Sequence, residues 1–299
     1  MDYNEFKEML INKIQRKMQR KAKIHIETIE VMNDVKKEAI VFAGSDKAIL
    51  FQRIYLDNLY EMYMSGIGLD ICADTAIAMY RETTGLKIEK ILKSWKEVKT
   101  KLDPVVMNKE WNKEILKNIP YKEKLDLAIC CRVILKQNDG KIFSVTVRKN
   151  MIDQWGITEE EFWEAVGDCF QKNDYLITSI NDLLRNQYYE QDGKDLMDDP
   201  EMQTQLYVMT NAYHNWGAAG FFRTDLLKEF SEELKMDLYV LPSSIHEIIL
   251  MPADGNADKD YLKKMVETIN EGCVERKEWL SNQVYYYSRE KEKVEIAAD

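Results

Sequence analysis

Apolar residues recur at helical spacing in several parts of the chain. One apolar stripe, formed by Phe6, Leu10, Ile14 and Met18, runs along a helix predicted over residues 2–21. Such a stripe packs against a core while the opposite face of the helix stays in water. The same period predicts helices over residues 57–81, with a break at Gly66 and Gly68, and over residues 86–102, where Asp103-Pro104 is expected to end the helix.

Other segments carry the patterns of strands. Residues 23–31 alternate apolar and polar side chains, which is typical of a half-buried strand. Asn138-Asp139-Gly140 supplies residues that accept a positive φ, so it predicts a tight hairpin turn between strands over residues 125–135 and 142–147. Further strands are predicted over residues 39–42, 48–54, 205–210, 237–241, 245–251 and 284–287, and further helices over residues 160–170, 224–236 and 257–270. Thr158 as N-cap and Glu161 predict a capping box at the start of the helix over residues 160–170.

The mixture of these elements indicates the fold class. Hairpins and helices share the whole length of the chain, which predicts an α+β fold with mixed, largely antiparallel sheets and packed helices. Because the pattern restarts after Asp103-Pro104, we expect two α+β subdomains, residues 1–103 and 104–299. Residues 186–202 hold six acids and one base, together with Gly193 and Pro200, and predict an exposed acidic loop in the second subdomain.

The composition of the chain says more about the cellular compartment and the ligands of the protein than about its fold. The 299 residues include 52 acids and 42 bases, for a net charge of -10, and five cysteines without a C-x-x-C pair. Such cysteines favour a reducing, cytoplasmic setting. No apolar run approaches the roughly 20 residues of a membrane helix, so we expect no membrane contact. Glycine-rich phosphate loops and clustered His, Cys or carboxylate ligands are missing from the sequence, so we expect no cofactor and no metal.

The first predicted helix also has a basic face. Such a face is typical of a nucleic-acid or acidic-partner footprint. It is also typical of a solvated helix surface, which we favour because no aromatic or Arg-rich reading element accompanies the bases. A protein partner is therefore expected before nucleic acid. The candidate partner-binding residues are Lys13, Arg16, Lys17, Arg20, Lys21, Trp155 and Trp163.

Residues 241–252 combine a prolyl turn, two serines, a histidine and a carboxylate with an apolar strand. One interpretation is a catalytic site with Ser243 or Ser244 as nucleophile, His246 as base and Glu247 as the orienting carboxylate. His214, with Asn211 and Asn215 beside it, follows another predicted strand and is expected to approach the same end of the sheet. The alternative, which we favour, is structural: the serines close the turn through backbone hydrogen bonds, and His246 satisfies a neighbouring backbone group.

Seven stretches of the chain carry a resemblance to a known family. They are Tyr55–Tyr63, Asp126–Ala128, Trp155–Glu161, Leu206–Asn211, Gly217–Ala219, Leu241–Glu247 and Leu280–Tyr287. Together and in this order they resemble a bacterial family, domain of unknown function 5688, which is common in gut Clostridia, and the resemblance spans nearly the whole chain. It implies a bacterial cytosolic protein, often encoded near mobile or accessory genes, and it carries over no catalytic residue because the family has no established activity.

Three functions remain open on these observations. We favour a noncatalytic interaction or binding protein, for which His246 is buried or structural. The alternative is a hydrolase or small-ligand enzyme with a Ser/His/Glu site at residues 243–247, which requires an open pocket and a nucleophile within hydrogen-bond reach of its base. Nucleic-acid binding through the basic helix ranks third.

Overall fold

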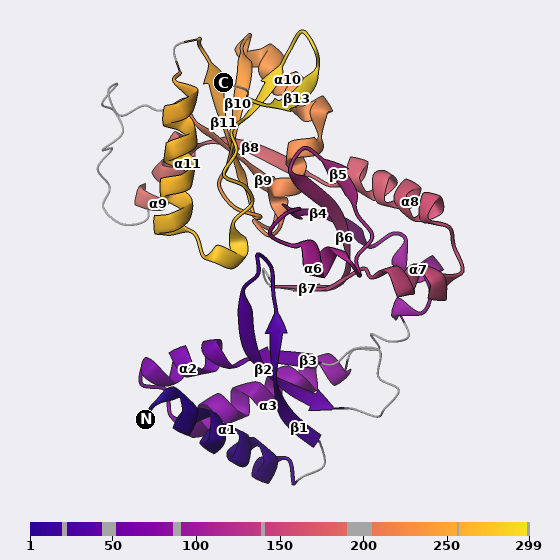
Figure 1. The fold of residues 1–299 in the computed structure, drawn as a ribbon, viewed down its shortest axis with the longest axis vertical. Coiled ribbons are helices and arrows are strands. Elements are labelled where there is room, and N and C mark those ends of the chain that lie inside the picture. The colour runs from indigo at the N-terminus through magenta and orange to yellow at the C-terminus, as the bar shows by residue number, and fades with distance from the viewer. Residues whose placement is uncertain are drawn as a thin grey trace. The chain divides into compact units, whose positions relative to one another are not determined.

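A computed structural model describes residues 1–19, 23–43, 52–85, 91–138, 141–189, 205–255 and 257–297 (Figure 1). Helices and strands are interspersed along these residues, and the strands form three sheets in which neighbouring strands run antiparallel. The predicted α+β fold with largely antiparallel sheets is therefore confirmed. The chain forms two compact units, Met1–Val98 and Lys99–Asp299, whereas the sequence places the boundary after Asp103.

The N-terminal unit is a three-stranded sheet, in the order β1-β2-β3, packed against three helices. The predicted stripe of α1 is its core, because Phe6, Leu10 and Ile14 are fully buried among Ile40 and Phe42 of β2. The break at the two glycines separates α2 from α3, as predicted. The elements are α1 (Tyr3–Lys17), β1 (Lys23–Glu30), β2 (Lys36–Ala43), β3 (Gln52–Tyr55), α2 (Leu56–Met64) and α3 (Leu69–Gly85).

The helix predicted over residues 86–102 is wrong in its C-terminal part. Residues 86–90 lie outside the described residues, α5 covers only Trp95–Val98, and β4 already begins at Leu102. The error lies in the interpretation of Pro104, which occupies the interior of β4 instead of ending a helix. A proline is tolerated there because β4 is the edge strand of its sheet, where a ladder hydrogen bond can be omitted.

The C-terminal unit contains two sheets. A six-stranded sheet has the order β13-β12-β10-β11-β9-β8, and a four-stranded sheet has the order β4-β6-β5 with β7 paired to β6. The short helix η2 (Gly217–Phe222) contacts β4 of one sheet and β9 and β11 of the other, so it lies where the two sheets meet. The strands are β4 (Leu102–Asn108), β5 (Lys122–Lys124), β6 (Leu127–Asn138), β7 (Lys141–Thr146), β8 (Tyr175–Ser179), β9 (Tyr207–Asn211), β10 (Asp237–Pro242), β11 (Ile248–Ala253), β12 (Tyr285–Ser288) and β13 (Lys293–Ile296).

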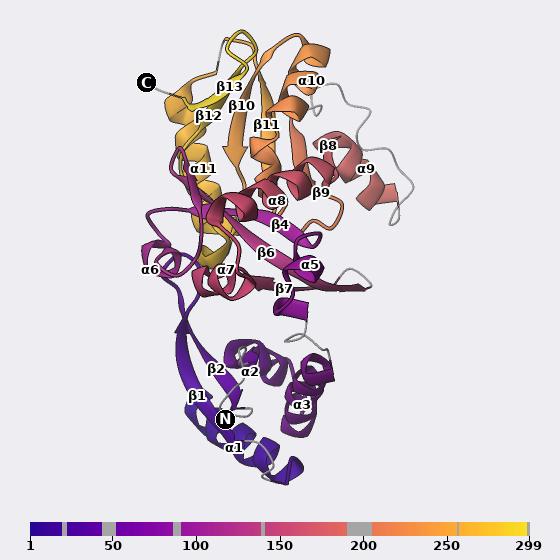
Figure 2. The same ribbon diagram turned by 90° about the vertical axis from the view of Figure 1, so that its right-hand side faces the viewer.

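Helices flank these sheets. Figure 2 shows α11 beside the six-stranded sheet, where Leu262 and Val266 pack against Tyr239 and Leu241. The predicted capping box at Thr158 is present at the start of α8. The helices of this unit are α6 (Lys113–Leu116), α7 (Lys149–Trp155), α8 (Glu159–Lys172), α9 (Ile180–Tyr189), α10 (Thr224–Leu234), α11 (Lys259–Cys273) and the short η3 (Arg276–Glu278).

The predicted hairpin is formed by β6 and β7, with a bulge between Ile134 and Lys136. The turn residues Asp139 and Gly140 lie outside the described residues. The predicted acidic loop also lies largely outside them, because α9 extends to Tyr189 and the description resumes at residue 205.

Candidate functional site

A buried ion pair joins two strands of the four-stranded sheet. Asp103 of β4 and Arg132 of β6 are directly opposite each other in the strand register. Arg132 Nε donates to Asp103 Oδ2 over 2.7 Å, and the two side chains are only 5% and 13% exposed. Asn173 Nδ2 donates to the other carboxylate oxygen over 2.8 Å. Burial raises the pKa of the Asp103 carboxyl, while the Arg132 guanidinium and the Asn173 amide oppose that shift.

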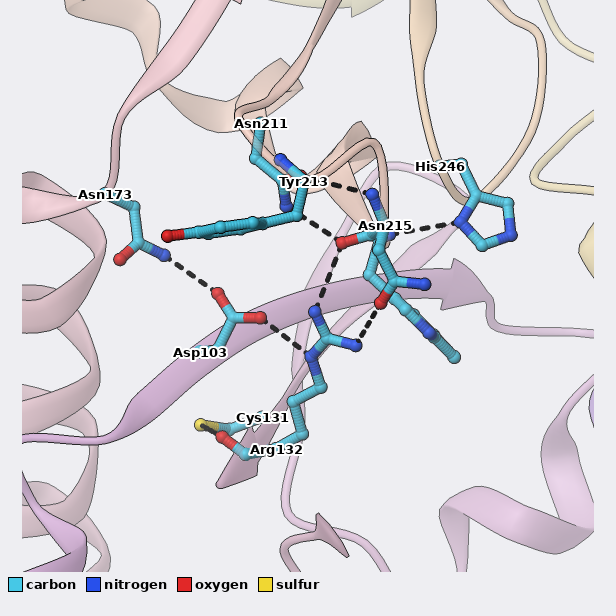
Figure 3. A network of polar contacts seen from close by, with 9 residues as sticks. Asp103, Cys131, Arg132, Asn173, Asn211, Tyr213, Asn215 and His246 are labelled. Carbon is cyan, nitrogen blue, oxygen red and sulfur yellow. Dashed lines mark hydrogen bonds and ion pairs between the residues drawn. The ribbon is translucent and has the colours of Figure 1, made fainter. Parts of the chain in front are cut away.

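The loop between β9 and η2 supplies further hydrogen-bond acceptors to Arg132 (Figure 3). Arg132 Nη1 donates to the side-chain oxygen of Asn215 over 2.7 Å, and Nη2 donates to its backbone oxygen over 3.1 Å. Asn211 organises the loop from within. Its Oδ1 accepts from the backbone N–H groups of Tyr213 and Asn215, and its Nδ2 donates to the Asn215 carbonyl.

The same loop holds an unfavourable backbone conformation. His214 and Trp216 have φ values of 49° and 59°, which are left-handed values that non-glycine residues adopt at a cost of about 1–3 kcal/mol each. Gly217 follows because no side chain fits there: an added Cβ would lie 2.3 Å from Thr210 Oγ1 and 2.7 Å from the His246 carbonyl oxygen. The conformation of the loop is therefore maintained by contacts with neighbouring residues and not by the local backbone preferences of His214 and Trp216.

A cavity of about 440 Å³ lies beside this ion pair and is called the Arg132 pocket below. Its volume is within the range of about 300–1,000 Å³ typical of small-molecule sites. Buried polar groups and an apolar wall of Ile134, Leu135 and Ile142 line it, and exposed residues surround its opening. The charged and amide side chains of the lining, together with its two loop residues Ala212 and Tyr213, are Lys101, Asp103, Arg132, Lys172, Asn173, Asp174, Asn211, Ala212 and Tyr213.

His246 connects the predicted Ser-Ser turn to the same loop. Its Nδ1 accepts the backbone N–H of Trp216 over 3.2 Å, and its Nε2 lies 3.8 Å from Glu278 Oε1. Burial lowers the pKa of His246, and the Glu278 carboxylate partly offsets this shift. The imidazole is therefore neutral at neutral pH, with Nδ1 as acceptor and Nε2 carrying the proton toward Glu278.

The structure brings the predicted catalytic residues into one turn, but through backbone contacts. Ser244 Oγ accepts the backbone N–H of His246, and the Ser244 N–H donates to the Glu247 carbonyl. Ser243 is half-buried, and His214 is exposed in the loop that approaches His246 through Trp216. These contacts are those of the structural alternative, so a nucleophile role for the serines stays a prediction.

The predicted partner-binding residues fall into different environments. Lys13 and Lys17 of α1 form ion pairs with Asp70 and Asp74 of α3, over 2.5 Å and 2.7 Å. Arg16 is exposed. Paired lysines have less charge to offer a phosphate backbone, so the solvated-surface interpretation gains support. Arg20 and Lys21 lie outside the described residues.

Of the two predicted tryptophans, Trp155 is buried against Phe162. Trp163 is half-buried, donates to Glu159, and lies under the Lys122 ammonium at 5.1 Å. A protein partner at Trp163 stays a prediction, whereas the burial of Trp155 favours a role in the core.

Asn211 and Asn215 are predicted from the sequence, whereas three residues that form the Arg132 pocket are not. Asp103 falls at the end of a predicted helix, and Asn173 follows a helix without any pattern around it. Arg132 did carry a signal. It stands in an apolar strand between Cys131 and Val133, and a charged side chain in such a position is rarely buried without a partner.

Residues 3–289 of the chain match a family described as a family of unknown function, DUF5688. The chain belongs to this family. The match confirms the resemblance found in the sequence, and it includes every residue that lines the Arg132 pocket. No curated protein and no solved structure matches the chain.

Among the described residues of this DUF5688 member, no helix is long and apolar enough to cross a membrane. The same residues contain no group of three or more His, Cys, Asp and Glu side chains placed to hold a metal ion.

Proposed function

We propose that this DUF5688 member is a noncatalytic binding protein that holds a small polar ligand in the Arg132 pocket. The observation that carries the proposal is the buried Asp103–Arg132 pair at a cavity of about 440 Å³. A buried ion pair contributes little to stability, since well-packed apolar residues of similar size are often as good or better. Ligand binding explains the buried ion pair better, because small-molecule sites present fixed polar groups to their ligands.

The strained loop supports the same proposal. His214 and Trp216 adopt unfavourable backbone conformations in the loop where Asn211 holds Asn215, and Asn215 accepts from Arg132. Such strain is found at sites where the arrangement of polar groups matters more than local stability. A preorganised site also binds more tightly, because the ligand does not have to order it.

Binding without catalysis is favoured by the hydrogen bonds of the titratable groups. Both carboxylate oxygens of Asp103 already accept a donor. Both ring nitrogens of His246 face a partner, the Trp216 N–H and the Glu278 carboxylate. The single lone pair of the neutral imidazole accepts the Trp216 N–H, so His246 has none left for a general base, and Asp103 is held by a donor at each oxygen.

The proposed setting is the cytoplasm of a bacterium. All five cysteines are free, and Cys130 and Cys131 are fully buried as adjacent residues of β6. Free thiols are maintained in reducing compartments, which fits this setting. Fractionation of the native host would test it, with recovery in a membrane or secreted fraction as the contrary result.

Thermal unfolding with a panel of small metabolites tests the binding function. Ala212 is exposed at the pocket, so Ala212→Trp is expected to fill its opening without disturbing the core. A ligand at a hundred times its Kd adds about 2.7 kcal/mol to the stability of the native state. Ligands that raise the melting temperature of the wild type should have no such effect on Ala212→Trp.

The matched control is Lys263→Trp, which places the same side chain on the exposed surface of α11. This variant should respond to ligands as the wild type does. Equal stabilisation of Ala212→Trp and the wild type would rule out the Arg132 pocket as the binding site.

A further inference from the structure

We infer that the ligand of the Arg132 pocket is a small organic anion, bearing a carboxylate or a phosphate group. The inference rests on the proposed binding function and adds the chemical class of the ligand. Its basis is the balance of charges and hydrogen-bond donors that line the pocket.

The charged residues of the lining are Lys101, Arg132 and Lys172 against Asp103 and Asp174. Asp103 and Arg132 neutralise each other. Among the described residues, neither Lys101 nor Lys172 forms an ion pair within 4.0 Å, so the two ammonium groups remain available. One exposed carboxylate, Asp174, stands against them. The unpaired charge at the pocket is therefore positive.

The hydrogen-bonding groups show the same bias toward donors. A guanidinium carries five N–H groups, and Arg132 gives three of them to Asp103 and Asn215. Two donors are left for a ligand oxygen. The Asp103 carboxylate, by contrast, already accepts from Arg132 and Asn173. A ligand rich in acceptor oxygens matches such a surface better than a ligand rich in donors.

The rest of the lining fits an organic body behind the anionic group. Tyr213 is 51% exposed although it lines the pocket, and its ring extends from the loop toward Asn173 (Figure 3). An exposed aromatic ring offers a flat apolar surface together with a hydroxyl group. Ile134, Leu135 and Ile142 supply further apolar area. An inorganic ion would leave all of these side chains without a contact.

The recognition has to be local, because the chain as a whole has a net charge of -10. Its long-range field repels anions, while charges beyond about 10 Å are screened at ordinary ionic strength. Two lysines and a guanidinium at one cavity provide attraction only to a ligand that enters it.

Isothermal titration calorimetry with matched compounds tests the inference. The compounds are phenylacetate, phenyl phosphate, the neutral phenylacetamide and the cationic phenethylamine, which share an aromatic ring and differ in charge. At least one of the two anions should bind the wild type about tenfold more tightly than the amide and the amine. The comparison of phenylacetate with phenyl phosphate separates a carboxylate ligand from a phosphate ligand.

A pair of double variants assigns the effect to the lysines. Lys101→Ala/Lys172→Ala should raise the Kd of the preferred anion about tenfold and reduce its salt dependence. Lys263→Ala/Lys264→Ala removes the same charge from the exposed surface of α11 and should leave the Kd unchanged. Unfolding curves of both variants confirm that each is folded.

The outcomes separate the inference from the function on which it rests. If the amide or the amine binds as well as either anion, and Ala212→Trp abolishes that binding, the ligand is not an anion but the pocket is a binding site. If neither anion binds while compounds from the thermal panel do, the anion assignment is likewise overturned. If Ala212→Trp abolishes the binding of no compound, the proposed function fails and the inference fails with it.

Discussion

Asp103 and Arg132 form an energetically coupled pair of buried charges. Each would be an uncompensated buried charge without the other, and each has further polar partners in Asn173 and Asn215. Their coupling can be measured directly by substituting one and then both.

Asp103→Leu is expected to lower the free energy of unfolding by about 3–5 kcal/mol, because Arg132 stays buried without its carboxylate. The double variant Asp103→Leu/Arg132→Met should recover part of this loss, since no unpaired charge remains. Urea denaturation of the single and double variants measures the coupling. Losses that simply add would show that the two side chains do not act as a pair.

A substitution at Gly217 tests the close packing around the loop. Gly217→Ala should destabilise the protein by about 1–3 kcal/mol, since its Cβ would meet Thr210, Asn211 and His246. Gly167→Ala is the matched control, because this glycine lies inside α8 with nothing near its Cβ position, and it should stabilise by about 0.5–1 kcal/mol. Equal effects of the two changes in urea denaturation would contradict the packing described here.

At the scale of elements, the loop between β9 and η2 depends on the turn between β10 and β11 through one imidazole. His246 accepts the Trp216 N–H only while Nδ1 is unprotonated. Acid therefore acts on the loop that positions Asn211 and Asn215, and through them on Arg132.

The pH dependence of stability follows from the lowered pKa of His246. The unfolded chain takes up this proton near pH 6.5 and the native state only at lower pH, so the contribution is complete above about pH 6.5 and declines as the pH falls below it. His246→Asn keeps an acceptor but does not titrate in this range, so its stability should fall less between pH 7 and pH 5. Identical pH profiles of the two proteins, from urea denaturation, would contradict the assignment.

The elements that the sequence predicts are those whose signal is local. The stripe of α1, the capping box at Thr158 and the Asn-Asp-Gly hairpin each depend on residues close in the chain. β4 was missed because Pro104 is a breaker inside a helix or a central strand but not at a sheet edge. Strand pairing between distant segments cannot be read from either strand alone.

The candidate site shows the same limit. Asn211 and Asn215 were included because they follow a predictable strand, and His246 because its neighbours resemble a catalytic set. Asp103 and Arg132 meet only through the register of β4 on β6, and Asn173 joins them from the end of α8. The residues of the loop are therefore predictable from local sequence, whereas the partners that the loop contacts become visible only in the tertiary structure.

At the scale of the whole molecule, the chain contains two compact units with their own cores. Each residue that lines the Arg132 pocket belongs to the unit Lys99–Asp299. The N-terminal unit has its own ion pairs between α1 and α3, so its basic helix is largely engaged within the unit.

This division predicts that a fragment of residues 99–299 retains ligand binding. Its Kd for the preferred ligand should match that of the full chain, because the fragment keeps every lining residue. Calorimetry measures the affinity, and circular dichroism shows whether the fragment is folded. A folded fragment without binding would show that the N-terminal unit contributes to the site.

Pro104 has one more consequence for the molecule. β4 is the edge of its sheet, so its backbone has a partner strand on one side only. Pro104 is buried in this strand, where a backbone N–H without a partner would be costly. Because proline has no N–H, the residue beside the ion pair presents no buried donor that would need a partner at this edge.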